Sequence, residues 1–234
     1  MTFGNNKSWN RQDVLKKKYN DTEVPSLEEL NNMISAIHFG KDDSEMQTYR
    51  ARALIALYYL TAGRLTEITY RTKAIFTNKI RENGLIVGRE KVTTYPEFKG
   101  IRKKDISFDY IDDRQVMYVR IENRKNKNRT TKKQPIPISL EKDIVRHITS
   151  YIEILNSDDL LFDFGNKRAT QIINQTIKFN PHFIRHIRAT HLITLYDFNE
   201  QTLIEFMGWS DARPAKHYME LSKKDLFRAF YKNK

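Results

Sequence analysis

The sequence predicts an α+β fold, in which a mostly helical domain contains one small antiparallel sheet. Three observations predict it: helical patterning over residues 25–62, short strand-like runs over residues 84–139, and a return to helical patterning over residues 140–234. Strands that form one block between helices are typical of α+β proteins, whereas strands that alternate with helices indicate a parallel sheet. With 234 residues, 39% of them hydrophobic, the chain is long enough for one domain with a substantial core.

The first two helices are marked by a capping signal and by an apolar run. Ser26, followed three residues later by Glu29, predicts a capping box that opens a helix, and Gly40 predicts its end. Residues 45–62 are apolar on nearly every side of a helix, which predicts a central, buried helix. Gly63 is well placed to end it.

The middle of the chain carries the strand signals. Short runs rich in β-branched and aromatic residues predict strands at residues 85–87, 106–108 and 116–121. Two prolines in the last strand, residues 135–138, place it at the edge of the sheet, because proline cannot donate to a central ladder. From residue 140 the chain is predicted to be helical again.

Composition and charge narrow the class of function. Lys and Arg number 41 against 29 Asp and Glu, a net charge of +12, and such a surplus attracts polyanions. The chain has no cysteine and no His-Glu-x-x-His spacing, which favours a reaction without metal or a binding role. The longest apolar run, residues 53–60, is too short to span a bilayer, and residues 1–20 lack the apolar core of a secretory signal.

Residues 180–186, Asn-Pro-His-Phe-Ile-Arg-His, predict the start of a helix that carries a cation. Asn180 is a good N-cap, and Pro181 suits the first helical position. His182 and Arg185 then share one side of the first turn. A guanidinium beside free backbone N–H groups favours a phosphate, and an ordinary surface salt bridge is the alternative.

Two further motifs are weak when taken singly. Arg64 follows the predicted buried helix on a glycine turn, and Glu67 is placed to hold its side chain. A structural ion pair is the more common use of such a pattern. Gly208 and Trp209 are followed, nine residues after the tryptophan, by Tyr218, and a single tyrosine more often packs than reacts.

In combination and in this order, the motifs resemble the tyrosine recombinase family, which includes phage-type integrases and the bacterial and archaeal chromosome-dimer recombinases. The resemblance runs from about Ser26 to Leu226, and the segment from Asn180 to Leu192 is specific by itself. It implies an archaeal or viral integrase-like catalytic domain that cleaves and rejoins DNA through a 3′-phosphotyrosyl intermediate, without metal or cofactor. We therefore expect a cytoplasmic protein associated with nucleoid or viral DNA.

The resemblance also implies a role for each matching residue. Arg64 and Arg185 would be the two catalytic arginines, with Glu67 supporting the first. His182 would be the histidine of the His-x-x-Arg motif. Trp209 stands where members have His or Trp, and Tyr218 falls on the nucleophile.

The family also uses a lysine on a β-hairpin, and residues 122–127 offer two candidates. We favour Lys125, because it directly follows the predicted strand, and Lys127 is the alternative. The basic residues of this hairpin are expected to contact the DNA backbone, with a solvated charged loop as the alternative: Arg124, Lys127, Arg129, Lys132 and Lys133.

The expected organisation is a basic N-terminal arm, residues 1–24, before a catalytic domain, residues 25–234. Residues 79–100 are expected to be an insertion, and residues 221–234 a C-terminal tail that is either exchanged between subunits or packed on its own chain. The expected partner is double-stranded DNA, to which a homotetramer would bind at synapsis. The free protein would be a monomer or a weak dimer, and we expect no binding to a membrane. Two alternatives stay open: topoisomerase IB-like cleavage and rejoining without strand exchange, and a non-catalytic DNA-binding regulator.

Overall fold

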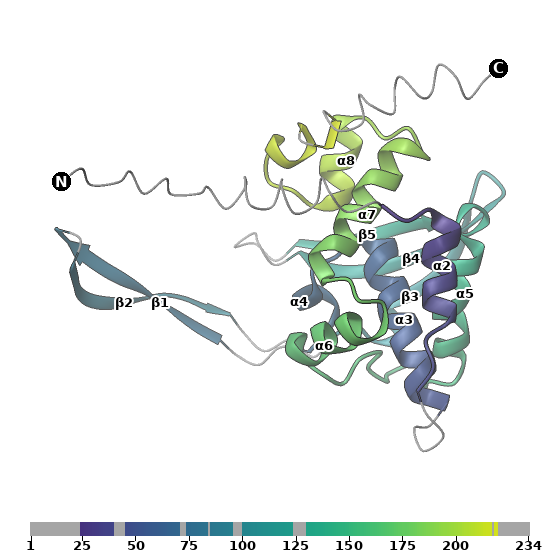
Figure 1. The fold of residues 1–234 in the computed structure, drawn as a ribbon, viewed down its shortest axis with the longest axis horizontal. Helices are drawn as coiled ribbons and strands as arrows, with labels where there is room; N and C mark the ends of the chain where they lie inside the picture. The colour runs from purple at the N-terminus through teal and green to yellow at the C-terminus, as the bar shows by residue number, and fades with distance from the viewer. Residues whose placement is uncertain are drawn as a thin grey trace, which may run out of the picture.

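The structure confirms the predicted α+β fold class. It is a computed structural model, and it describes residues 24–39, 45–70, 74–83, 85–95, 100–123, 130–216 and 218–219. In chain order the elements are α2 (Leu27–Ser35), α3 (Glu45–Thr61), α4 (Leu65–Ile68), β1 (Ala74–Glu82), β2 (Leu85–Tyr95), η1 (Lys103–Asp105), β3 (Ile106–Ile111), β4 (Arg114–Asn123), β5 (Thr130–Pro137), η2 (Ile138–Leu140), α5 (Lys142–Glu153), α6 (Asn166–Thr176), α7 (Pro181–Thr194) and α8 (Glu200–Met207). Figure 1 shows α3 among the other helices, with the sheet of β3, β4 and β5 beside them.

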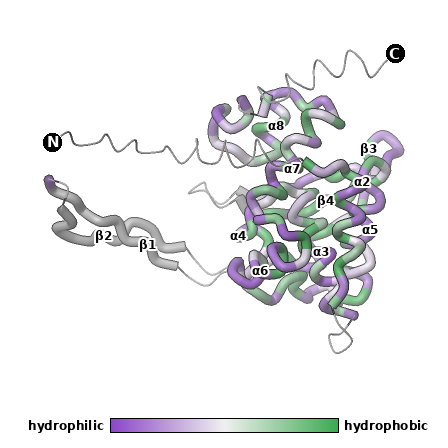
Figure 2. Tube along the Cα trace, in the orientation of Figure 1, coloured by the Kyte–Doolittle hydropathy of each residue, from purple (hydrophilic) through white to green (hydrophobic). Residues whose placement is uncertain are grey.

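Helix α3 forms the centre of the core, as its apolar sequence predicts. Its residues 53–60 are all buried, and it contacts α2, α5, α6 and α7. A helix surrounded in this way has no face that needs to be polar. Figure 2 shows hydrophobic segments inside this helical body. Among the described helices, none combines the length and the hydropathy needed to cross a membrane.

Strands β3, β4 and β5 form an antiparallel sheet in that order. The proline-containing strand β5 lies at one edge, as predicted. The central strand β4 buries alternate residues, Met117, Val119 and Ile121, which is the pattern of a strand with one face on the core. Lys132 and Gln134 of β5 donate to the carbonyl oxygen of Phe206 in α8.

A second, two-stranded sheet consists of β1 and β2 alone. The strands are joined by residues 83–84, Asn-Gly, and Asn83 has a positive φ of 50°, as the first position of a type I′ hairpin turn requires. The strand predicted at residues 85–87 is therefore the start of a longer one. Figure 1 shows this β1–β2 ribbon extending away from the helical body, on the side where α4 and α6 lie.

The C-terminal helices form a second apolar cluster beside the main core. It comprises Ala62, Ala189, Leu192, Leu203, Met207 and Ala215, with Trp209 and Tyr218 packed against it. Helix α7 begins as predicted, with Asn180 accepting from the backbone N–H of Phe183 at 2.9 Å and Pro181 in the first turn. Helix α8 ends at Gly208, which is left-handed (φ 64°).

The first helix is shorter than predicted. The capping box of Ser26 and Glu29 is formed, but α2 ends at Ser35 rather than near Gly40. The guanidinium of Arg52 donates to the carbonyl oxygens of Ser35 (2.6 Å) and Ile37 (2.8 Å), so the free carbonyls of the helix end are satisfied by α3. Gly40, residues 1–23 of the predicted arm, and residues 221–234 of the predicted tail lie outside the described residues.

Candidate active site

Arg64 is positioned by a tight turn between α3 and α4. Ala62, rather than the predicted Gly63, leaves α3 in the left-handed conformation with a φ of 46°. A Cβ atom on Gly63 would lie 3.2 Å from Ile68 Cδ1 and 3.2 Å from Thr61 Oγ1, so a larger residue at this position would require these side chains to shift by a few tenths of an ångström. The backbone N–H of Arg64 donates to Glu67 Oε2 (2.8 Å), and Arg64 Nη1 donates to Glu67 Oε1 (2.6 Å). Both the backbone and the guanidinium of Arg64 are therefore held by one buried carboxylate.

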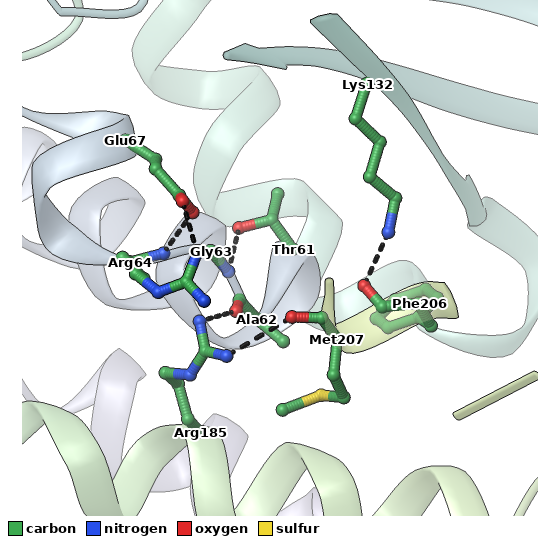
Figure 3. A network of polar contacts seen from close by, with 9 residues as sticks. All are labelled: Thr61, Ala62, Gly63, Arg64, Glu67, Lys132, Arg185, Phe206 and Met207. Carbon is green, nitrogen blue, oxygen red and sulfur yellow. Dashed lines mark hydrogen bonds and ion pairs between the residues drawn. The ribbon is translucent and has the colours of Figure 1, made fainter. Parts of the chain in front are cut away.

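Arg185 enters the same place from α7. Its guanidinium is buried, with 8% of the residue exposed; it donates from Nη1 to the carbonyl oxygen of Ala62 and from Nη2 to that of Met207 at 3.3 Å. Figure 3 shows the guanidinium groups of Arg64 and Arg185 next to each other, beside Ala62. Within the described part of the chain, no carboxylate forms an ion pair with Arg185. Burial lowers the pKa of Arg185 from its usual value, and the nearby charge of Arg64 lowers it further.

Tyr218 packs between two aromatic residues at this site. Its ring centroid lies 5.6 Å from that of Trp209, nearly parallel at 15°, and 5.2 Å from that of His186. The phenol is close enough to Arg185 to oppose the fall in the pKa of that guanidinium. The structure therefore brings Tyr218, Trp209 and Arg185 together, although they are far apart along the chain.

Lys132 interacts electrostatically with Arg185 and Glu67 of this site, whereas the sequence predicted for it only a contact with the DNA backbone. Its Nζ donates to the carbonyl oxygens of Glu205 (2.5 Å) and Phe206 (2.6 Å) at the end of α8 (Figure 3). Burial is the main cause that lowers the pKa of Lys132 to about 8, and the charge of Arg185 contributes. One signal could have found it, because strand alternation places position 132 on the same face of β5 as the buried residues Gln134 and Ile136.

The histidines differ in their surroundings. His182 is exposed on the first turn of α7, one turn before Arg185. His186 is buried, and it stacks on Phe183 (5.5 Å, 20°) as well as contacting Tyr218. No sequence motif assigned a role to His186, because only the tertiary structure places Tyr218 beside it.

The remaining predicted residues are those of the hairpin. Arg124, Lys125, Lys127 and Arg129 lie outside the described residues. Lys133 is exposed on β5, and its Nζ stands 3.9 Å from the centroid of the Tyr118 ring. The DNA contacts expected of these side chains stay predictions.

A buried ionic cluster lies one helical turn beyond Arg185. Arg188 donates from both terminal nitrogens to Glu141, with Nη2 to Oε2 at 3.1 Å, and Tyr196 donates to Glu141 Oε1 at 3.0 Å. Arg188 is 1% and Glu141 2% exposed. The pair ties α7 to the start of α5, and so fixes the helix that carries Arg185.

The chemistry available at the site follows from its charges. The guanidinium groups of Arg64 and Arg185 lie at the turn that contains Ala62, and the ammonium of Lys132 interacts electrostatically with Arg185 and with the carboxylate of Glu67. Buried cations that are held mainly by carbonyl dipoles gain from an anion that brings its own charge. A phenol stands beside them, so the site combines anion recognition with a nucleophile.

The sequence and the structure were both compared with those of known proteins. No family model matches the sequence, and no curated protein matches it. The structure is similar to that of the XerH site-specific recombinase bound to a palindromic difH substrate in a post-cleavage complex, with a TM-score of 0.51 and 17% identity over 88% of this chain and 53% of that one. It is also similar to the XerH pre-cleavage complex with difH substrate, with a TM-score of 0.50 and 16% identity over 86% of this chain and 50% of that one.

The chain thus spans about half the length of these recombinases. At such low identity the likeness concerns the path of the backbone. A mostly helical body with a small antiparallel sheet, superimposable on two recombinase structures, defines the architecture. This protein has the fold of a tyrosine recombinase catalytic domain.

Proposed function

We propose that this protein is a site-specific DNA recombinase of the integrase type, which cleaves and rejoins DNA through a 3′-phosphotyrosyl intermediate on Tyr218. The observation that carries the proposal is the buried guanidinium of Arg185, which interacts electrostatically with both Arg64 and the phenol of Tyr218 and has no carboxylate in ion-pair contact among the described residues. A DNA phosphodiester would supply the missing negative charge. The XerH structures of similar fold are complexes with DNA substrates before and after cleavage.

The two arginines would bind the non-bridging oxygens of the scissile phosphate. Attack by a phenolate oxygen on phosphorus builds charge on those oxygens in a five-coordinate state, and two guanidiniums can stabilise it without a metal. Each side chain is held in advance, Arg64 by Glu67 and Arg185 by two main-chain carbonyls. Such preorganisation is what lowers the barrier, since no reorientation is needed during the reaction.

In the proposed step the Oη atom of Tyr218 bonds to phosphorus, and the bond from phosphorus to the 5′ oxygen breaks. The phenol proton passes to His182, which we propose as the general base. His186 and Trp209 hold the ring of Tyr218 between them, and the indole N–H of Trp209 would donate to a phosphate oxygen. The covalent ester conserves the energy of the broken bond, so the reverse attack rejoins DNA without ATP.

The leaving 5′ oxygen needs a proton, and a lysine would provide it. Lys132 is the described lysine whose position supports this role, because its Nζ lies near Arg185 and its pKa is lowered to about 8. Its ammonium has three N–H donors, and two of them bind the end of α8. Lys125, which the sequence favours, and Lys127 are the other candidates.

The test is the covalent adduct itself. The protein is incubated with nicked duplexes that carry its target site, and the products are separated under denaturing conditions. We expect a protein–DNA adduct without metal or ATP, its loss in Tyr218→Phe, and its persistence in Tyr110→Phe, a control at an exposed tyrosine of β3. An adduct that survives Tyr218→Phe would contradict the assignment of the nucleophile.

A further inference from the structure

The β1–β2 ribbon has no part in the proposed chemistry, yet its register sorts its charges. Facing positions in an antiparallel pair share one face of a sheet, and neighbours along a strand alternate between faces. One face carries the pairs Thr77↔Lys91, Lys79↔Arg89 and Arg81↔Ile86. The other carries Asn78↔Glu90, Ile80↔Gly88 and Glu82↔Leu85. All four cations of the ribbon, Lys79, Arg81, Arg89 and Lys91, therefore share one face, and both acids, Glu82 and Glu90, share the other.

An irregularity in β2 produces this separation. The register shifts between Ile80 and Arg81, where β2 contains the extra residue Val87. Without that bulge, Arg89 would face Asn78 and Lys91 would face Phe76, on the face opposite to Lys79 and Arg81. With it, Lys79 faces Arg89. Like charges placed opposite each other destabilise a sheet, and bulges are often found where a strand face is redirected for function. An anion from outside the ribbon would relieve this repulsion.

The dimensions and the place of the ribbon point to the kind of anion. A strand of nine residues is about 30 Å long, close to one turn of B-DNA, which is about 34 Å. The major groove admits a two-stranded β-ribbon. Strand β1 begins seven residues after Glu67, and Figure 1 shows the ribbon reaching outward on the side of α4. It can thus reach DNA that flanks a phosphate bound at Arg64.

We propose that the β1–β2 ribbon is a duplex-DNA-binding arm, which lays the face that carries Lys79, Arg81, Arg89 and Lys91 on DNA flanking the cleavage site. This inference rests on the proposed function, since it takes DNA as the substrate. The arm would add affinity for DNA by neutralising phosphates and releasing counterions. This contribution to binding is separate from the chemistry at Tyr218.

The test compares the two faces of the ribbon in full-length protein that also carries Tyr218→Phe, so that cleavage does not interfere. One variant is Lys79→Gln, Arg81→Gln, Arg89→Gln and Lys91→Gln together; the matched control is Glu82→Gln with Glu90→Gln. Binding to a fluorescent duplex of about 40 base pairs is measured by anisotropy over a series of salt concentrations. Melting curves check that each variant is folded.

We expect the cation variant to bind at least about tenfold more weakly, with the slope of log Kd against log salt reduced by about 2 to 4 units, since each phosphate contact contributes about 0.9. The acid variant should bind as tightly as its parent or slightly more tightly. Unchanged affinity and slope in the cation variant would overturn the inference. A variant that changed only in its self-association would also overturn it, because the ribbon would then contact another protein chain instead of DNA.

The two proposals fail in different ways. If the wild-type chain forms no adduct while the ribbon variant still loses DNA affinity, the phosphotyrosyl chemistry is wrong and the arm stands. If the adduct forms and the ribbon variant binds normally, the arm alone is wrong.

Discussion

Arg185 is a buried cation with hydrogen-bond partners but, among the described residues, without an ion-pair partner of opposite charge. Removing a guanidinium from water carries a penalty unless a partner of opposite charge is present. Here the partners are the carbonyl oxygens of Ala62 and Met207, which supply dipoles and no net charge. The nearest carboxylate, Glu67, is used by Arg64. A phosphate between the two arginines would balance the site, which is why we place the reacting group there.

Lys132 yields a prediction about pH. Because its pKa is lowered to about 8, the ammonium is protonated at neutral pH and loses its proton as the pH rises above about 8. If Lys132 protonates the leaving oxygen, cleavage of ordinary DNA should fall above that pH. Lys132→Ala should slow cleavage strongly, and DNA with sulfur in place of the 5′ bridging oxygen should restore the rate, since a thiolate leaves without a proton.

The matched controls are Lys125→Ala and Lys127→Ala, assayed with both substrates. The quantity measured is the rate of adduct formation in a single turnover. Rescue by sulfur in Lys125→Ala but not in Lys132→Ala would move the proton donor to Lys125, and the same result in Lys127→Ala would move it to Lys127.

At the scale of elements, the site depends on the alignment of α7 and α8 with the main core. The ion pair of Arg188 and Glu141 joins α7 to α5, and Tyr59 bonds to His191 Nδ1 (2.8 Å) from α3. His191 in turn bonds through Nε2 to the carbonyl oxygen of Pro25 (2.9 Å). Burial lowers the pKa of His191 to about 4, so the ring is neutral at pH 7, donating from Nε2 and accepting at Nδ1. Four segments are thus tied together behind Arg185.

The ion pair predicts a strongly non-additive pattern of stability. Arg188→Met alone or Glu141→Leu alone leaves a buried charge without its partner, and each should lower the free energy of unfolding by about 3–5 kcal/mol. The double variant removes both charges, so its loss should be much smaller than the sum. Urea unfolding of the four proteins of this cycle measures the coupling. Additive single effects would show that the two side chains act independently.

At the scale of the whole molecule, strand exchange requires more than one copy. We propose a homotetramer on two synapsed duplexes, with a monomer or weak dimer in the absence of DNA. Light scattering after size exclusion should give a mass near 27.8 kDa, or twice that, for the free protein, and four protomers on DNA. Deletion of residues 221–234 should weaken the tetramer if the tail is exchanged. A lower melting temperature of the free truncated chain, with normal assembly on DNA, would show instead that the tail packs on its own chain.

The products formed from plasmid DNA that carries two target sites distinguish a recombinase from an enzyme that only cleaves and rejoins DNA. Recombinant products between two target sites support strand exchange. Relaxation of supercoils without recombinants would assign the protein to topoisomerase-like chemistry with the same tyrosine.

The sequence by itself determined those features that neighbouring residues decide. The capping box at Ser26, the buried α3, the edge strand β5 and the Asn-Pro start of α7 depend on contacts within a few residues, or on the period of the apolar pattern. Local signals therefore sufficed for the fold class and for the order of helices, sheet and helices, but not for strand β1. They also placed Arg64 beside Glu67, because the N-cap and the third residue of a helix lie close together.

Only the tertiary structure decided which distant residues meet. Lys132 reaches the end of α8 more than 70 residues away, Arg188 pairs with Glu141 across 47 residues, and His186 stacks beside Tyr218. The charge separation on the β1–β2 ribbon depends on one bulge, which shifts every later pair without leaving a distinctive pattern in the sequence. Such contacts follow from the path of the chain through space, because the energy of each becomes available only after the helices and strands between the partners have packed.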